Sequence, residues 1–157
     1  MPVSAWHAEP ELPQGTLAVV LPGGFSYGDY LRCGAIARFA PVMDAVSRFA
    51  ETGGLVLGIC NGFQILCEAG LLPGALRLNR QQCFVCRDVR VTVESTVSPV
   101  LSGCEAGDEL VIPVKHGEGN WYASEPLLRE LEEAGQIALR YTEDVNGSVS
   151  LVAGVTS

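Results

Sequence analysis

The spacing of apolar residues changes several times along the chain and indicates both strands and helices. Short continuous apolar runs at 16–21 and 55–59 are typical of strands buried on both faces, as in a parallel sheet. Apolar residues at helical spacing follow at 61–68, whereas valines alternate with polar residues at 85–94, as in a half-exposed strand. This pattern predicts an α/β fold with antiparallel strands added in the second half.

The remaining elements follow from the same pattern. Further strands are expected at 109–114, 136–141 and 149–152, and further helices at 33–51 and 125–134. Pro41 should divide the first of these helices, because proline opens a helix readily but disrupts a helix interior. No repeat, low-complexity tract or linker interrupts the sequence, so we expect a single domain over residues 1–157.

The most informative chemistry lies where the second apolar run ends. The stretch Leu-Val-Leu-Gly-Ile-Cys-Asn-Gly-Phe-Gln places Cys60 on a sharp turn between a strand and a helix. Gly58 and Gly62 would let the backbone crowd closely there, as in the nucleophile elbow of hydrolases. The amides and dipole of a helix N-terminus favour the reactive thiolate. A buried structural cysteine is the alternative, but the Gly-x-Cys-x-Gly-x-Gln pattern favours a nucleophile.

A second glycine-rich turn ends the strand at 16–21. Its sequence, Pro-Gly-Gly-Phe-Ser-Tyr-Gly-Asp-Tyr from Pro22, would point backbone N–H groups into a common space. The amide of Gly24 and the amide of Asn61, directly after the cysteine, would then form an oxyanion hole for a tetrahedral acyl intermediate. An ordinary turn is the alternative interpretation of this loop alone.

Net charge and hydropathy indicate which kinds of binding partner and which cellular compartment to expect. The net charge of −8 over 157 residues excludes nucleic acid and an anionic membrane as expected partners. No apolar run is long enough to span a bilayer, and the N-terminal residues lack the pattern of a signal peptide. We therefore expect a soluble, cytoplasmic protein.

The cysteines predict neither a disulfide framework nor a metal site. Their spacing is not that of a small secreted scaffold, and they are Cys33, Cys60, Cys67, Cys83, Cys86 and Cys104. The Cys-x-x-Cys pair at 83–86 could form half of a zinc site or a redox pair. A second Cys/His pair at ligand spacing is absent, and the pair opens an expected strand rather than a helix, so we expect no metal.

These motifs resemble those of the class I (triad) glutamine amidotransferases. The Pro-Gly-Gly turn and the Gly-x-Cys-x-Gly-x-Gln frame mark that broad class, and residues 24–37, Cys-Arg-Asp-Val at 86–89 and His-Gly-Glu-Gly-Asn at 116–120 narrow it. The narrower resemblance is to the glutaminase subunits of phosphoribosylformylglycinamidine synthase, an enzyme of purine biosynthesis, and it runs from about Trp6 to nearly the last residue. It implies a flavodoxin-like, three-layer fold with a mostly parallel sheet.

The resemblance also implies a mechanism. The Cys60 thiolate would attack the side-chain amide of glutamine, ammonia would leave, and water would hydrolyse the glutamyl thioester. Ammonia would pass to a large synthetase subunit, which works with a small accessory subunit. The glutaminase would need no cofactor or metal, since ATP and magnesium belong to the synthetase.

Further residues take roles by the same resemblance. Gln64 would hold the substrate glutamine together with Gly23 and Phe25, although a solvated helix residue is the alternative for Gln64. Three charged residues flank the oxyanion loop and would contact the substrate or the synthetase, or simply begin an exposed helix: Asp29, Arg32 and Arg38.

The chain also departs from the family pattern. Family members begin with a strand and a helix before the region of Trp6, and they continue into a segment whose His-Pro-Glu motif supplies the catalytic histidine and glutamate. Neither feature has a counterpart in this sequence, so we expect a partial domain, truncated at both ends. The family's first strand would lie between the strands at 16–21 and 55–59, so its absence would leave their edges unpaired.

Two other functions therefore stay open. A catalytically incomplete subunit would keep the fold and the partner surface without turnover. A different cysteine-elbow protein, such as an intracellular-protease-like hydrolase or chaperone, is the second, but the residues from Pro22 to Tyr30 count against it. The histidines are His7, in a polar segment, and His116, which would lie in a loop at the site edge or at a subunit contact, or act as a substitute base.

Overall fold

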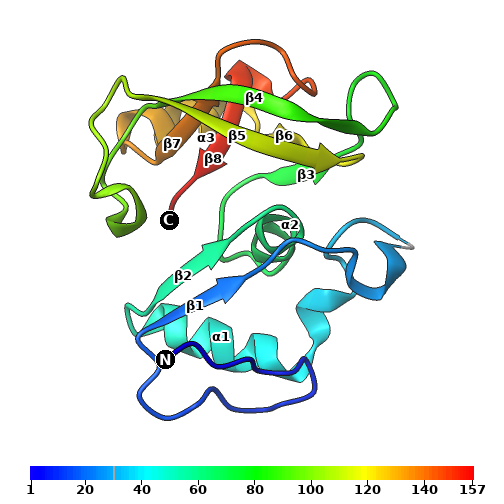
Figure 1. Ribbon diagram of the computed structural model, residues 1–157, viewed down its shortest axis with the longest axis vertical. Coiled ribbons are helices and arrows are strands. Elements are labelled where there is room, and N and C mark those ends of the chain that lie inside the picture. Colours follow the sequence, from blue (N-terminus) through cyan, green and yellow to red (C-terminus); the bar gives the residue numbers. More distant parts are fainter. Residues whose placement is uncertain (30) are drawn as a thin grey trace. The chain divides into compact units, whose positions relative to one another are not determined.

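The computed structural model describes residues 1–29 and 31–157, without the side chain of Asp29. These residues form two compact units, Met1–Leu71 and Leu72–Ser157, each with its own strands and helices (Figure 1). The expected combination of helices with parallel and antiparallel strands is confirmed. The single domain over residues 1–157 stays a prediction.

The first unit is built on two parallel strands, β1 (Ala18–Leu21) and β2 (Leu55–Gly58), with the helices α1 (Pro41–Glu51) and α2 (Asn61–Glu68) (Figure 1). The strands pair directly, from Ala18 opposite Leu55 to Leu21 opposite Gly58. The expectation that the absence of the family's first strand would leave the facing edges of these two strands unpaired is therefore wrong. The connection through α1 brings the two apolar runs into register, which satisfies the backbone groups between them.

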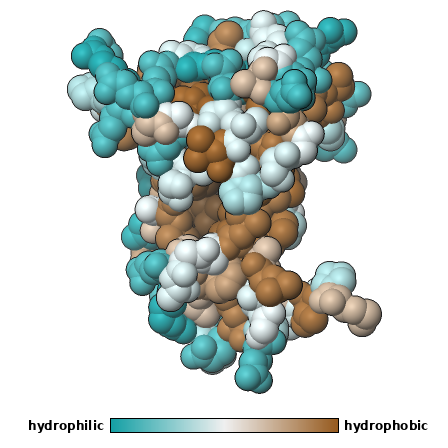
Figure 2. All heavy atoms as spheres, turned by 90° about the vertical axis from the view of Figure 1, so that its left-hand side faces the viewer, coloured by the Kyte–Doolittle hydropathy of each residue, from teal (hydrophilic) through white to brown (hydrophobic). Residues whose placement is uncertain are grey.

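Burial of these strands is less complete than their apolar sequence predicts. Val20 of β1 is 56% exposed, Ile59 just after β2 is 50% exposed, and Leu17 just before β1 is 90% exposed. Figure 2 shows apolar side chains gathered on the surface of this unit. Burial on both faces, as the continuous apolar runs predict, is thus not seen among the described residues.

The expected long helix at 33–51 is shorter in the structure. A single 3-10 turn, η2 (Ala37–Phe39), is followed by an extended residue, Ala40, and then by α1. Pro41 occupies the first turn of α1, where its missing N–H would have no partner anyway. The break at Pro41 is confirmed, whereas the helix expected before it, from residue 33, is wrong: only the single turn η2 forms there. A further 3-10 turn, η1 (Ser26–Asp29), follows β1.

The second unit contains a four-stranded antiparallel sheet in the order β5-β4-β7-β8 and a separate antiparallel pair, β3 with β6. Its elements are β3 (Ala75–Arg77), β4 (Val85–Val93), η3 (Pro99–Leu101), β5 (Glu109–His116), β6 (Asn120–Tyr122), α3 (Glu125–Glu133), β7 (Ile137–Tyr141), η4 (Val149–Leu151) and β8 (Val152–Val155). Antiparallel pairs therefore form the larger share of the strand pairing in the part of the chain that the structure describes.

Two expectations for this unit need correction, and its two shortest strands are not predicted by the sequence. Strand β5 continues past Val114 to His116, which pairs with Val85, so His116 ends a strand instead of lying in a loop. Strands β3 and β6 have three residues each and too few positions to show an alternating pattern. At the strand expected at 149–152, residues Val149–Leu151 form the kinked turn η4 instead, and the positive φ angles of Ser150 and Leu151 are incompatible with an extended strand.

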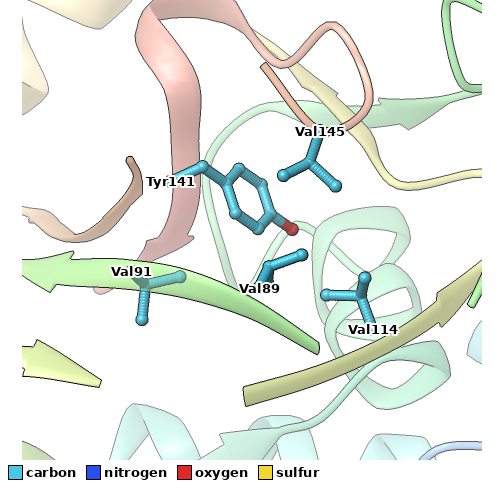
Figure 3. Packing of buried hydrophobic residues seen from close by; sticks show 5 residues of the cluster. All are labelled: Val89, Val91, Val114, Tyr141 and Val145. Carbon is cyan, nitrogen blue, oxygen red and sulfur yellow. The ribbon is translucent and has the colours of Figure 1, made fainter. Parts of the chain in front are cut away.

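The core of the second unit confirms the alternation predicted for β4. Val89 and Val91 are buried with Val114, Tyr141 and Val145, and their side chains turn toward one another in Figure 3. Arg90, which lies between Val89 and Val91, is exposed. The alternating pattern thus fixes which face of the sheet meets the core.

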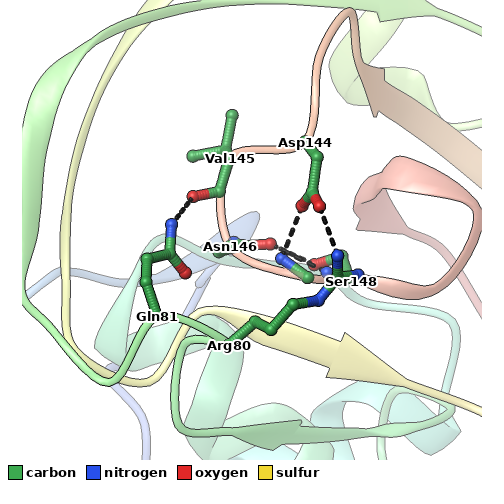
Figure 4. A network of polar contacts seen from close by, with 7 residues as sticks. Arg80, Gln81, Asp144, Val145, Asn146 and Ser148 are labelled. Atoms are coloured by element: carbon green, nitrogen blue, oxygen red, sulfur yellow. Dashed lines mark hydrogen bonds and ion pairs between the residues drawn. The ribbon is translucent and has the colours of Figure 1, made fainter.

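Polar contacts hold the loop between β7 and η4 (Figure 4). Arg80 pairs with Asp144 at 2.7 Å between Nη1 and Oδ2, and the Gln81 amide donates to the Val145 carbonyl at 2.6 Å. The buried Ser148 hydroxyl donates to Asn146 Oδ1 at 2.7 Å.

No helix among residues 1–29 and 31–157 is both long enough and apolar enough to cross a membrane.

Candidate active site

Cys60 occupies the sharp turn that its sequence predicts. It follows β2 and precedes the first residue of α2. Its backbone has φ 53° and ψ −111°, a conformation that residues other than glycine rarely adopt. Such a backbone costs about 1–3 kcal/mol and persists only where the surroundings impose it. The backbone N–H of Gln64 donates to the Cys60 carbonyl at 3.1 Å, so α2 begins directly after the cysteine. Cys60 is exposed to solvent at this turn.

Gly62 explains how α2 can start so close to β1. A Cβ atom at this position would lie 2.0 Å from the Leu21 carbonyl oxygen, far inside van der Waals contact. The Ile59 amide also donates to that carbonyl oxygen at 2.9 Å. Only a glycine therefore allows the end of β1, the turn and the first residues of α2 to meet.

The Pro-Gly-Gly loop lies against the cysteine. A Cβ atom on Gly23 would lie 3.3 Å from the Cys60 Cβ and 4.0 Å from its Sγ, whereas the same position on Gly24 faces open space. The structure therefore brings together two segments that are more than thirty residues apart, as the sequence predicts. Binding of an oxyanion by the Gly24 and Asn61 amides stays a prediction.

Three polar side chains connect this loop with α2. The Ser26 hydroxyl and backbone amide both donate to Asn61 Oδ1, at 2.5 and 3.2 Å, and the Asn61 amide group donates to Gln64 Oε1 at 2.9 Å. Asn61 is 1% exposed and Gln64 is 5% exposed. No local sequence pattern predicts roles for Ser26 or the Asn61 side chain, because their contact joins residues thirty-five positions apart.

The other predicted binding residues have the following surroundings. Phe25 is 71% exposed beside the loop. Arg32 Nη2 lies 2.7 Å from Glu68 Oε2 in a two-pronged ion pair, and Arg38 Nη1 donates to the Glu68 carbonyl at 2.8 Å. Both arginines thus contact the end of α2. The role predicted for the side chain of Asp29 lies outside the described residues, and the substrate contacts of Gln64, Gly23 and Phe25 stay predictions.

The other cysteines differ from Cys60 in their surroundings. Burial, with a smaller contribution from Glu68, raises the pKa of Cys67 to about 12, so this thiol stays protonated near neutral pH. Cys83 and Cys86 are exposed and not joined by a disulfide. Among the described residues, no three or more His, Cys, Asp and Glu side chains are grouped so that they could hold a metal ion.

The two histidines have defined contacts within their own units. In the first unit, the His7 ring meets the rings of Trp6 and Tyr27 edge to face. In the second unit, His116 Nδ1 lies 3.0 Å from Asn79 Oδ1. Burial lowers the pKa of His116, although a backbone hydrogen bond partly opposes this effect. The role of His116 as a substitute base stays a prediction.

Comparison with known proteins identifies the family. A family model of the CobB/CobQ-like glutamine amidotransferase domain matches residues 9–157. The chain is 58% identical to the phosphoribosylformylglycinamidine synthase subunit PurQ of Rubrobacter xylanophilus, over 99% of this chain and 70% of that protein. It is 55% identical to the subunit of the same name from Rhodopseudomonas palustris, over 97% of this chain and 69% of that protein.

A solved structure agrees with these relatives. A chain in the structure of PurLQS from Thermotoga maritima matches with a TM-score of 0.84 and 41% identity, over 92% of this chain. The match spans 64% of that chain, which is less than two thirds of its length. The resemblance noted in the sequence is thereby confirmed: this chain belongs to the CobB/CobQ-like glutamine amidotransferases and, within them, to the PurQ subunits of phosphoribosylformylglycinamidine synthase.

Proposed function

We propose that this chain acts as a glutaminase that cleaves the side-chain amide of L-glutamine through a thioester on Cys60 and supplies ammonia for purine biosynthesis. The observation that carries the proposal is the turn at Cys60, whose strained backbone presents an exposed thiol beside the Pro-Gly-Gly loop. This arrangement suits a nucleophile that needs backbone amides close to it. The match to a glutamine amidotransferase family model supports the same chemistry.

The proposed reaction has two steps. The Cys60 thiolate attacks the amide carbon of glutamine, and the amides of Gly24 and Asn61 stabilise the oxyanion. The carbon–nitrogen bond then breaks, and the nitrogen takes a proton and leaves as ammonia. Water hydrolyses the remaining thioester to glutamate and restores the thiol. Gln64, Gly23 and Phe25 would hold the substrate.

The partners follow from the same proposal. A large synthetase subunit consumes the ammonia and uses ATP and magnesium, with a small accessory subunit in the assembly, and the glutaminase itself needs no cofactor. The complex works in the cytoplasm. The structure of PurLQS, to which this chain is similar, supports such an assembly.

Labelling with diazo-oxo-norleucine, an electrophilic analogue of glutamine, tests the proposal. We expect mass spectrometry to find the label on Cys60 of the purified chain, slower labelling in the presence of excess L-glutamine, and none in Cys60→Ala. Cys67 is the matched internal control, because its raised pKa keeps it protonated. Preferential labelling of Cys83 or Cys86, or no protection by glutamine, would contradict the proposed function.

A second candidate is a subunit that binds the synthetase without turning glutamine over. The observation that favours it is the histidine content: His7 and His116 both stand outside a His-Pro-Glu motif. Stimulation of ammonia release by an added synthetase subunit distinguishes the two candidates. A catalytic subunit shows Cys60-dependent release, whereas a non-catalytic one binds the synthetase and releases none.

A further inference from the structure

A chain of hydrogen bonds, half-buried at Ser26 and buried at Asn61 and Gln64, joins the Pro-Gly-Gly loop to the first turn of α2. Ser26 donates twice to Asn61 Oδ1, and Asn61 Nδ2 donates to Gln64 Oε1. We refer to these three side chains, Ser26, Asn61 and Gln64, as the loop latch. Asn61, its central member, is 1% exposed, so water does not compete for its hydrogen bonds.

The direction of the latch is fixed by one obligatory donor. The backbone N–H of Ser26 can only donate, so the Asn61 side chain must turn its oxygen toward Ser26. Its NH₂ group then has to face Gln64, which accepts through Oε1. An asparagine satisfies both neighbours with one acceptor and one donor, and an aliphatic side chain of similar size satisfies neither.

The position of the latch relates it to the reacting centre. Ser26 follows Gly24 by two residues, and Asn61 follows Cys60 directly. In the proposed reaction, the amides of these same two positions, Gly24 and Asn61, bind the oxyanion. Asn61 would thus supply one donor through its backbone and hold the loop that supplies the other through its side chain.

We propose that Ser26 and the side chain of Asn61 are positioning residues that fix the distance between the two oxyanion donors. The inference rests on the proposed glutaminase function. Oxyanion donors are effective only when they already point to where the negative charge develops, and loss of one donor lowers a rate by about 10²–10³. A loop released from Asn61 would keep Gly24 near the cysteine but no longer hold its amide in place.

Two electrophiles separate this role from a purely structural one. Iodoacetamide alkylates an accessible thiol by direct displacement of iodide, without an oxyanion. The chloromethyl ketone analogue of glutamine first adds the Cys60 thiolate at its carbonyl carbon, which gives a tetrahedral oxyanion that needs both donors. The sulfur then displaces chloride from the adjacent carbon, and the ketone re-forms in a stable thioether. Loss of the latch should lower the maximal rate of labelling by the ketone at Cys60, with little change in the concentration that gives half that rate. A purely structural role would change both reagents equally or change only stability.

The variants are Ser26→Ala and Asn61→Ala, with Ser26→Thr as the conservative replacement. Ser26 is only half-buried, so its alanine variant should fold even if the Asn61 variant does not. Thr52→Ala is the matched control, because the Thr52 hydroxyl donates to a backbone carbonyl, that of Phe49 at 2.8 Å, away from the loop. We expect Ser26→Ala to lower the maximal ketone rate by about tenfold or more. Ser26→Thr and Thr52→Ala should keep it, and iodoacetamide should label all variants within about twofold of the original chain.

The outcomes distinguish the two proposals. If the unaltered chain reacts with iodoacetamide at Cys60 but not with the glutamine ketone, the glutaminase function fails and the latch role fails with it. If the unaltered chain reacts with the ketone and Ser26→Ala reacts equally fast, only the latch role is overturned. If Ser26→Ala lowers the labelling rate equally with both reagents, the latch role is also overturned, because that result indicates general damage to the turn.

Discussion

At the residue scale, the hydrogen bonds of Asn79 determine which ring nitrogen of His116 carries the proton. The Asn79 amide group donates to the carbonyl oxygens of Cys83 and His116, at 2.8 and 2.9 Å, so its oxygen is the acceptor for the Gly119 amide and for His116 Nδ1. The proton of the neutral imidazole therefore sits on Nδ1. Nε2 is buried without a hydrogen-bond partner among the described residues, so a second proton there would add a charge that nothing nearby accepts.

This arrangement predicts a pH-dependent stability. Burial lowers the pKa of His116 in the folded chain below the ordinary value of 6.5, so the unfolded chain binds the proton more readily. The stabilisation is complete above pH 6.5 and is lost as the pH falls toward the folded pKa, by at most about 1.4 kcal/mol per pH unit. The His116→Asn variant keeps a donor for Asn79 but cannot titrate, so its stability should fall less on acidification.

Urea unfolding at pH 7.5 and about 5.5 checks this expectation. The fluorescence of Trp121, which is 1% exposed and lies in the same unit as His116, reports the transition, whereas Trp6 is 71% exposed. Contributions from His7 are common to both proteins and cancel in the comparison. Equal pH dependence in the two proteins would show that His116 does not carry the effect.

At the scale of elements, the close approach of β1 and α2 depends on Gly62. An alanine there would place its Cβ 2.0 Å from the Leu21 carbonyl oxygen, and a backbone atom cannot move aside as a flexible side chain can. We expect Gly62→Ala to lower the free energy of unfolding by about 2 kcal/mol or more, because α2 must shift away from the strand. Gly103→Ala is the control, since a Cβ there meets no atom within 4 Å. Denaturation followed by circular dichroism measures both, and a Gly62→Ala chain as stable as the control would contradict this account.

The elements also show what local sequence can and cannot predict. Strand β2, the turn at Cys60 and helix α2 are predicted well because an apolar run, two glycines and helical spacing all agree. The turn η4 is missed because the apolar pattern of a strand continues through residues with positive φ. Hydrogen bonds such as those of Ser26 and Asn79 join residues more than thirty positions apart, and no periodic pattern records them.

At the scale of the whole molecule, the candidate groups for the proposed acyl transfer are divided between the two units. Cys60, the Pro-Gly-Gly loop and the loop latch belong to Met1–Leu71, whereas His116 belongs to Leu72–Ser157. A cysteine nucleophile of this class needs a histidine to take its proton and to protonate the departing ammonia, and a carboxylate to orient that histidine. The proposed nucleophile and the Pro-Gly-Gly loop beside it therefore lie within one unit.

We accordingly expect this chain alone to react at Cys60 with electrophiles but to hydrolyse glutamine very slowly. Loss of general acid–base assistance lowers a rate by about two to four orders of magnitude, and it affects ammonia release more than alkylation because the leaving amine needs a proton. Ammonia release by the purified chain is compared with that of Cys60→Ala and His116→Ala. If turnover is fast and needs Cys60 but not His116, the expectation is wrong and another group delivers the proton. If turnover is fast and is lost in both variants, the expectation is also wrong, and His116 is required for turnover.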